Sequence, residues 1–287
     1  MEDNFQKIKK IVEKEENCTD AGHNMEHTLR VYNMCLKLAE DILGCDLEVI
    51  KFAALLHDIG GQKEIQDKSG KTDHALIGAK MAEPILKEMG VSDEKVKHIQ
   101  DCIVSHRYKT ENQPKTIEAK ILFDADKLDA LGAIGIARAF VWVGNNRAKI
   151  YYKPDNLDEY IKENLCDGKM NGRIQDKSKH SFQIEFETKI KFIVDKLYTK
   201  KAKKIGKERT EYFKKFLDRL EKEVKDKMYY NQDNSIKLKN YGKYRNNARK
   251  KHTKRFVFAS FGNSYALLVS SKFRNLAVAI HKLLFAD

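Results

Sequence analysis

Four segments of the chain begin with a residue that caps helices and continue with apolar residues three or four positions apart, the spacing of an amphipathic helix. Three of them cover 47–57, 74–89 and 93–106, and the caps of all four are Asp46, Asp73, Ser92 and Thr116. The fourth, 117–142, is long enough for more than one helix, and Gly132 and Gly135 would permit a bend or close packing there. The pattern predicts an all-α helical bundle.

The composition agrees with this fold class. Hydrophobic residues make up 41% of the 287 residues and charged residues 34%, with only 3 prolines, which excludes fibrous and collagen-like chains and disfavours an all-β fold. The five cysteines show no paired spacing, and no basic-then-apolar signal segment opens the chain. We therefore expect a cytoplasmic protein, and no apolar run reaches the length of about 20 residues that spans a membrane.

The second half of the body has a different organisation. Residues 151–177 are polar and contain Pro154, Gly168 and Gly172, so they are interpreted as a loop-rich excursion and a candidate lid. From about 180 to 227 a charged helical pattern returns and predicts two helices.

The net charge of +13 is concentrated at the end of the chain. Residues 228–287 hold 12 lysines and arginines against 2 acidic residues, so the first 227 residues carry only +3. We expect a domain over 1–227 and a basic extension over 228–287 whose structure the sequence does not give. The simplest interpretation of the extension is a solvated, disordered segment. Interleaved aromatic residues also fit a surface for unpaired bases, and the apolar end could pack on the body or on a second subunit.

Six imidazoles and carboxylates fall at predicted helix ends: His27, His57, Asp58, His74, His106 and Asp126. Adjacent residues on a helix point about 100° apart, so His57 and Asp58 can face one ion only near a terminus, and the Gly60–Gly61 pair permits the backbone to bend there. Nitrogen and oxygen ligands without a thiolate set indicate a catalytic site for a divalent ion, Mn, Fe, Co, Ni, Mg or Zn.

These residues resemble the pattern of the HD-domain metal-dependent phosphohydrolases, which is a His, a His-Asp doublet and a distant Asp. The first position matches His27 in HNMEHTLRV, the doublet matches His57 and Asp58 in LLHDIGG, and the last matches Asp126 in DADKLDALGAIGIARAF. The resemblance covers about residues 20–225 and is similar to a subgroup of small stand-alone bacterial and archaeal HD hydrolases. It does not cover the basic extension.

The resemblance implies that the doublet Asp can bridge two metals. His74 and His106 lie between the doublet and Asp126, where such proteins hold the second ion, so one ion is expected and a second is open. For His74 the alternatives are a helix cap or a substrate phosphate ligand. For His23 the alternatives are a further pocket residue or only a cap, and Asp124 and Asp129 are expected to make supporting or packing hydrogen bonds.

A divalent ion lowers the pKa of bound water from 15.7 to about 7 and neutralises charge on phosphoryl oxygens, which is the reason such a site hydrolyses phosphate esters. Asp58 would ligate the ion and hold or deprotonate the water. Lys127 and Arg107 are the candidate cations for the developing charge, on adjacency to Asp126 and His106, with Arg138 and Arg209 as weaker candidates.

The sequence thus predicts a phosphohydrolase that cleaves a nucleotide phosphate ester or phosphoanhydride by means of a metal-activated water. Two alternatives stay open. One is a metal-dependent nuclease that holds nucleic acid with the basic extension, and the other is a non-catalytic nucleic-acid or partner-binding protein in which the metal site only senses a ligand.

Overall fold

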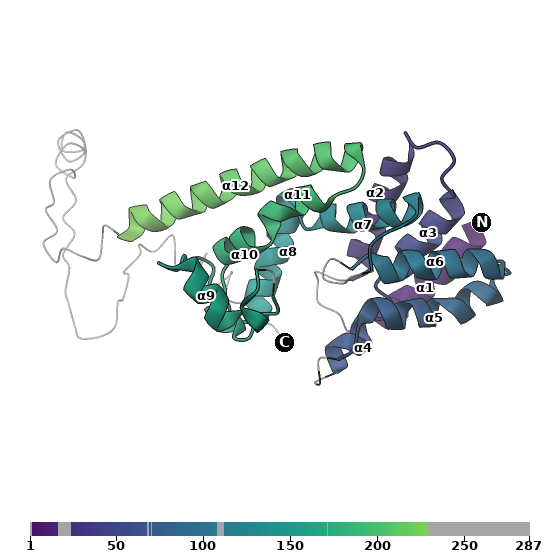
Figure 1. The fold of residues 1–287 in the computed structure, drawn as a ribbon, viewed down its shortest axis with the longest axis horizontal. Helices are drawn as coiled ribbons and strands as arrows, with labels where there is room; N and C mark the ends of the chain where they lie inside the picture. The colour runs from purple at the N-terminus through teal and green to yellow at the C-terminus, as the bar shows by residue number, and fades with distance from the viewer. Residues whose placement is uncertain are drawn as a thin grey trace, which may run out of the picture. The chain divides into compact units, whose positions relative to one another are not determined.

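The computed structural model describes residues 2–16, 24–67, 69, 71–107, 112–170 and 172–228, and these residues form an all-α fold, as predicted (Figure 1). The predicted extension, apart from Met228, and His23 lie outside the described residues. No helix among the described residues is long and apolar enough to cross a membrane.

The first helices build the part of the fold that carries the predicted site. They are α1 (Glu2–Glu16), α2 (Met25–Ala39), α3 (Leu47–Leu56), α4 (Gly61–Gln66), α5 (His74–Glu88), α6 (Asp93–Ser105) and α7 (Ile117–Asp129). Helix α3 contacts α2, α6 and α7, and α5 packs on α6. Seven of the ten residues of α3 are buried, which identifies it as the central helix of the core, because a helix that is apolar all round must be covered on every side.

The predicted helix starts are confirmed. Asp46, Asp73, Ser92 and Thr116 each accept hydrogen bonds from the backbone N–H groups of the following turn. A capping side chain of this kind stabilises a helix by about 1 kcal/mol and also sets the residue at which the helix begins. The caps therefore fix where the polar residues at the helix ends emerge.

The long segment 117–142 divides into two helices, and α8 covers Gly132–Asn145. The chain turns at Ala130 and Leu131, and Gly132 adopts a φ of +69°, a conformation that strongly favours glycine. A Cβ added at Gly135 would lie 2.2 Å from the carbonyl oxygen of Ala130, so this glycine permits the close packing.

The remaining elements are α9 (Leu157–Asn164), α10 (Phe182–Thr188), α11 (Ile193–Lys196) and α12 (Lys200–Met228), with three 3-10 turns at Cys166–Gly168, Lys177–Lys179 and Ile190–Phe192. The excursion 151–177 thus contains a helix, and 180–228 contains three helices instead of two. Helix α12 contacts α8 and α11, and α11 lies directly beside it (Figure 1). Phe213 of α12 contacts Phe182 and Phe186 of α10 with ring centroids 4.9 and 5.6 Å apart, which joins these helices into the main core.

Candidate metal centre

His57 and Asp58 lie where α3 ends, as predicted. His57 is the C-terminal cap of α3, is fully buried, and donates from Nδ1 to the carbonyl oxygen of Ala54 at 2.9 Å. The chain turns over residues 57–60, as expected, but Gly60 has a φ of −83°, which other residues also adopt. A Cβ at Gly60 would instead lie 2.3 Å from the carbonyl oxygen of His74, so this glycine brings the doublet close to α5.

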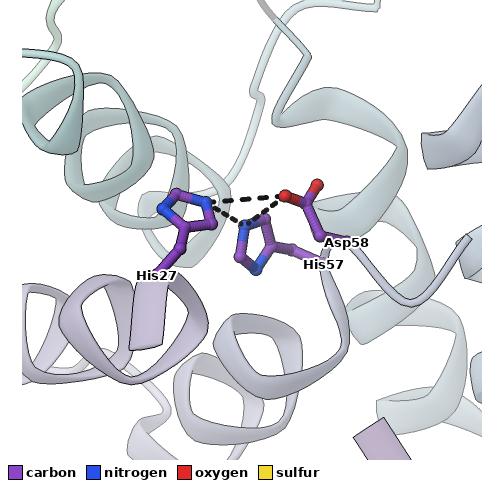
Figure 2. A group of neighbouring side chains, drawn as sticks. All are labelled: His27, His57 and Asp58. Atoms are coloured by element: carbon purple, nitrogen blue, oxygen red, sulfur yellow. Dashed lines mark hydrogen bonds and ion pairs between the residues drawn. The ribbon is translucent and has the colours of Figure 1, made fainter. Parts of the chain in front are cut away.

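His27 comes from the first turn of α2, which Asn24 caps. Its Nε2 lies 3.5 Å from Oδ2 of Asp58, and Nε2 of His57 lies 3.5 Å from the same oxygen (Figure 2). The two Nε2 atoms are 3.3 Å apart. Ligand atoms of these three residues lie within 4.8 Å of one another, close enough to share one ion.

His74 and His106 form a matching group on the other oxygen of Asp58. Nε2 of His74 lies 3.5 Å from Oδ1 and Nε2 of His106 lies 3.4 Å from it. The two Nε2 atoms are 3.2 Å apart. Asp73, and not His74, caps α5, so the capping alternative for His74 is wrong. Asp58 therefore stands between two pairs of imidazoles.

Asp126 lies at the edge of the first group. Its Oδ1 is 3.5 Å from Nε2 of His27, and its Oδ2 accepts a hydrogen bond from Lys127. Burial alone would raise the pKa of Asp126, but the charges of Lys127 and His27 outweigh burial and hold the pKa well below its usual range. Asp126 is thus an ionised carboxylate at the rim of the cluster.

Every imidazole of the cluster is oriented by a hydrogen bond at Nδ1. His57 and His106 bond to the carbonyl oxygens of Ala54 and Ile103, and His74 bonds to Glu64. His27 bonds to Oδ2 of Asp129 at 2.7 Å. An acceptor at Nδ1 keeps a ring proton there, so that Nε2 holds the lone pair when the ring is neutral, which is the usual arrangement around metal-binding histidines.

Asp129 is held in turn by two arginines. Arg30 contacts both carboxylate oxygens, at 2.8 and 3.0 Å, and Arg138 donates to Oδ2 at 2.8 Å. Burial would raise the pKa of Asp129, whereas the hydrogen bonds from His27 and Arg30 lower it well below its usual value. Asp124, on the same helix, accepts from the backbone of Tyr198 and Thr199 just before α12. Both aspartates have the supporting roles expected from the sequence.

The opposed Nε2 atoms test whether the residues fit a cation. Two facing Nε2 atoms 3.2–3.3 Å apart need a proton or a metal ion between them, because two facing lone pairs repel. Neighbouring ligands at about 2.1 Å from a divalent ion are themselves about 3.0–3.4 Å apart, so the observed spacing suits a shared ion. Burial lowers the pKa of His57 to about 4, so this ring is neutral. Burial would also lower the pKa of His27, but the hydrogen bonds to Asp129 and Asp58 raise it to about 9, so without an ion Nε2 of His27 carries a proton that a metal ion would replace.

Two residues of this region have roles that the sequence does not reveal in advance. Glu64 of α4 accepts from the backbone N–H of His74 at 3.1 Å as well as from its ring. Arg107 lies 2.8 Å from Glu64 and 2.9 Å from Asp73, so two carboxylates balance its charge. The only sequence signal for Glu64 is its position shortly after the doublet. Arg209, a weaker candidate cation, donates to the carbonyl oxygen of Leu128.

Comparison with known proteins identifies relatives of the chain. The family model of the HD domain matches residues 24–131. The protein YpgQ of Bacillus subtilis (strain 168) is 27% identical over 208 residues, which are 71% of this chain and 85% of YpgQ. Ribonuclease Y of Chloroflexus aurantiacus is 28% identical over 173 residues, or 52% of this chain and 31% of the ribonuclease.

Solved structures show the same fold. A predicted HD superfamily hydrolase from an uncultured Thermotogales bacterium is 27% identical, has a TM-score of 0.51, and is matched over 76% of this chain and 92% of the hydrolase. The crystal structure of B. subtilis YpgQ in complex with ADP has a TM-score of 0.56 at 24% identity, over 77% of this chain and 95% of YpgQ.

Proposed function

We propose, on the premise that residues 24–131 form an HD domain and that the chain resembles HD superfamily hydrolases, that it is a divalent-metal-dependent phosphohydrolase acting on nucleotides. The observation that carries the proposal is the convergence of four imidazole Nε2 atoms, in two pairs, on the two oxygens of Asp58. A partly buried carboxylate between two pairs of oriented imidazoles suits a centre for two ions.

His27, His57, Asp58 and Asp126 would hold the first ion. Asp58, His74 and His106 would hold the second. When bound, such ions supply Lewis acidity toward phosphoryl oxygens and a water that is acidic near neutral pH. The donor set of nitrogen and oxygen atoms fits Mn, Fe, Co, Ni, Mg or Zn.

Residues of the chain itself perform the other tasks. Asp58 is 14% exposed, and burial would raise its pKa, but the surrounding imidazoles lower the pKa well below its usual range, so Asp58 stays ionised and would hold an attacking water by accepting a hydrogen bond from it. Lys127 extends its ammonium group to Asp126 and is placed to meet negative charge on the phosphoryl group. Arg107 acts indirectly, because it supports Glu64, which orients His74.

The nucleotide class rests on the relatives. YpgQ was crystallised with ADP, and this chain matches most of the length of YpgQ. Every nucleoside phosphate carries an ester bond, and di- and triphosphates also carry anhydride bonds, that a pair of cations could polarise. We therefore propose nucleoside mono-, di- or triphosphates as the substrates.

The direct test is product analysis with nucleoside mono-, di- and triphosphates in the presence of Mn, Co, Ni or Mg. Orthophosphate and pyrophosphate should be resolved separately, because the product identifies which bond breaks. We expect metal-dependent release by the wild type and loss of release in Asp58→Ala. Folded protein that releases neither product with any metal would contradict the proposal and would favour a ligand-sensing role.

A second candidate is a metal-dependent nuclease, and the likeness to ribonuclease Y favours it. The chain spans only 31% of that ribonuclease, so the likeness concerns one part of it. The same assay with single-stranded RNA, for the full chain and for a chain that ends at Lys227, separates the two candidates. Cleavage of RNA that requires residues 228–287, without release from free nucleotides, would favour the nuclease.

A further inference from the structure

A pocket of about 350 Å³ lies between α8, α10 and the excursion 151–177, outside the cluster around Asp58. This volume is within the range of about 300–1,000 Å³ that is typical of small-molecule sites. Its apolar wall is formed by Ala139, Val143, Leu165, Ile174, Phe182 and Ile190. Trp142, which is the single tryptophan of the chain, also lines it.

The charged residues of the pocket are mostly cations. Among the described residues of the lining, Glu185 is the one acidic side chain, and it is engaged by Lys189 at 2.8 Å and by His180 at 3.1 Å. Tyr160 closes this network with a contact of 2.8 Å to Nδ1 of His180. The carboxylate of Glu185 is thus paired within the network. The network holds the pocket wall in place and offers no unpaired negative charge to a ligand.

Arg173 and Lys177 differ from this network in how their charges are paired. Both side chains are exposed at the pocket and, within the part of the chain that the structure describes, neither forms an ion pair with a carboxylate. Two cations beside an apolar wall and an indole favour an organic dianion whose ring lies against the wall and whose phosphate meets the cations. A cationic or purely apolar ligand would leave these charges unmatched.

We propose that this pocket is a second ligand site, for a nucleoside monophosphate or a similar phosphorylated ring compound, separate from the metal centre. Arg138 lines the pocket and also donates to Oδ2 of Asp129, the oxygen that binds Nδ1 of His27. Arg138 and Asp129 thus connect the pocket to Nδ1 of His27. A phosphate that attracts Arg138 competes with Asp129 for it and thereby affects His27.

Trp142 gives the test a readout that does not depend on catalysis. The full chain, in EDTA and with excitation at the red edge of indole absorption, is titrated with AMP, with adenosine and with inorganic phosphate. We expect a saturable change in fluorescence with AMP. Adenosine and inorganic phosphate should each bind about tenfold more weakly, because adenosine lacks the contacts of the phosphate and phosphate lacks the contacts of the ring. Asp58→Ala should bind AMP as the wild type does, since Asp58 is not in the pocket.

The double variant Arg173→Ala/Lys177→Ala should weaken AMP binding by about tenfold or more, which is the effect of losing charge-assisted hydrogen bonds. Lys179→Ala is the matched control, because Lys179 is equally basic, 69% exposed and absent from the pocket lining. The proposal is overturned if AMP causes no saturable change, if the double variant binds like Lys179→Ala, or if the change is lost in Asp58→Ala. None of these outcomes depends on whether the protein hydrolyses nucleotides.

Coupling to the metal centre is tested by titration with Mn²⁺ with and without saturating AMP. Because AMP draws Arg138 toward the pocket, His27 loses a nearby positive charge and should bind a cation more tightly, by about fivefold, which is a typical coupling between sites. The double variant should show no such change. Equal Mn²⁺ affinity of the wild type in both conditions would overturn the coupling.

Discussion

Asp129 accepts a hydrogen bond from Nδ1 of His27 at 2.7 Å, although the two residues are 102 positions apart in the chain. The contact joins the start of α2 to the end of α7 and fixes the direction in which Nε2 of His27 points. Arg30 and Arg138 donate to the same carboxylate, so Asp129 is held in place as the support of His27.

Replacing Asp129 should lower the affinity of the first metal site without unfolding the protein. For Asp129→Asn we expect a loss of Mn²⁺ affinity of about 10- to 100-fold, because a supporting carboxylate makes imidazole a stronger ligand. Isothermal titration measures the change. Asp124→Asn is the matched control: it lies on the same helix and is buried, but it bonds to the backbone before α12, so its Mn²⁺ affinity should equal that of the wild type. Equal affinities for both variants would refute the role of Asp129.

Glu64 has the corresponding role for the second ion. Glu64→Gln removes the negative charge beside Nδ1 of His74, so we expect the affinity for the second Mn²⁺ to fall about tenfold while the first is retained. Glu83→Gln serves as control, because Glu83 is paired with Lys87 on the far part of α5. A titration in which both Mn²⁺ affinities fall together would show that Glu64 does not act on one site alone.

Alanine substitutions at the two adjacent glycines after the doublet should change the free energy of unfolding in different ways. In Gly60→Ala the new Cβ would meet the backbone of His74 at 2.3 Å and of Gly78 at 2.7 Å, so we expect the free energy of unfolding to fall by about 3 kcal/mol. Nothing lies within 4 Å of a Cβ at Gly61, and Gly61→Ala should be neutral or stabilising by about 0.5–1 kcal/mol. Urea unfolding of both variants measures the difference, and similar free energies would contradict the close approach.

Acid should destabilise the pocket network through Glu185. Burial would raise the pKa of Glu185, but Lys189 and His180 lower it well below its value of 4.5 in the unfolded chain. The stabilisation is therefore present above pH 4.5 and is lost as the pH falls below it. Glu185→Gln should lose less stability than the wild type between pH 7 and pH 4, by about 1 kcal/mol. Thermal unfolding across this interval is the measurement, and identical losses in the two proteins would exclude Glu185 as the source.

Local signals in the sequence were sufficient for the fold class and the helix starts. A cap such as Asp46 or Asp73 acts on the next turn of its own chain, so residue type and spacing reveal it. The division between α7 and α8 was open in the sequence, because a glycine such as Gly132 fits both a bend and a close contact. The match of the HD domain model to residues 24–131 confirms the family resemblance.

The supporting residues of the site could not be assigned in the same way. Asp124, Asp126 and Asp129 share one helix, and only the packing of α2 and of the segment before α12 determines which of them meets an imidazole and which meets backbone. Glu64 likewise acts on His74, on the next helix, through a contact that no local spacing encodes. The ligand roles of the six residues stay predictions.

The most direct test of the central proposal, two ions held on the two oxygens of Asp58, is anomalous diffraction at the manganese edge from crystals grown with Mn²⁺. We predict two peaks, one among His27, His57 and Oδ2 of Asp58, and one among His74, His106 and Oδ1. A single peak beside Asp58, or peaks only at other positions, would contradict a centre built on both oxygens.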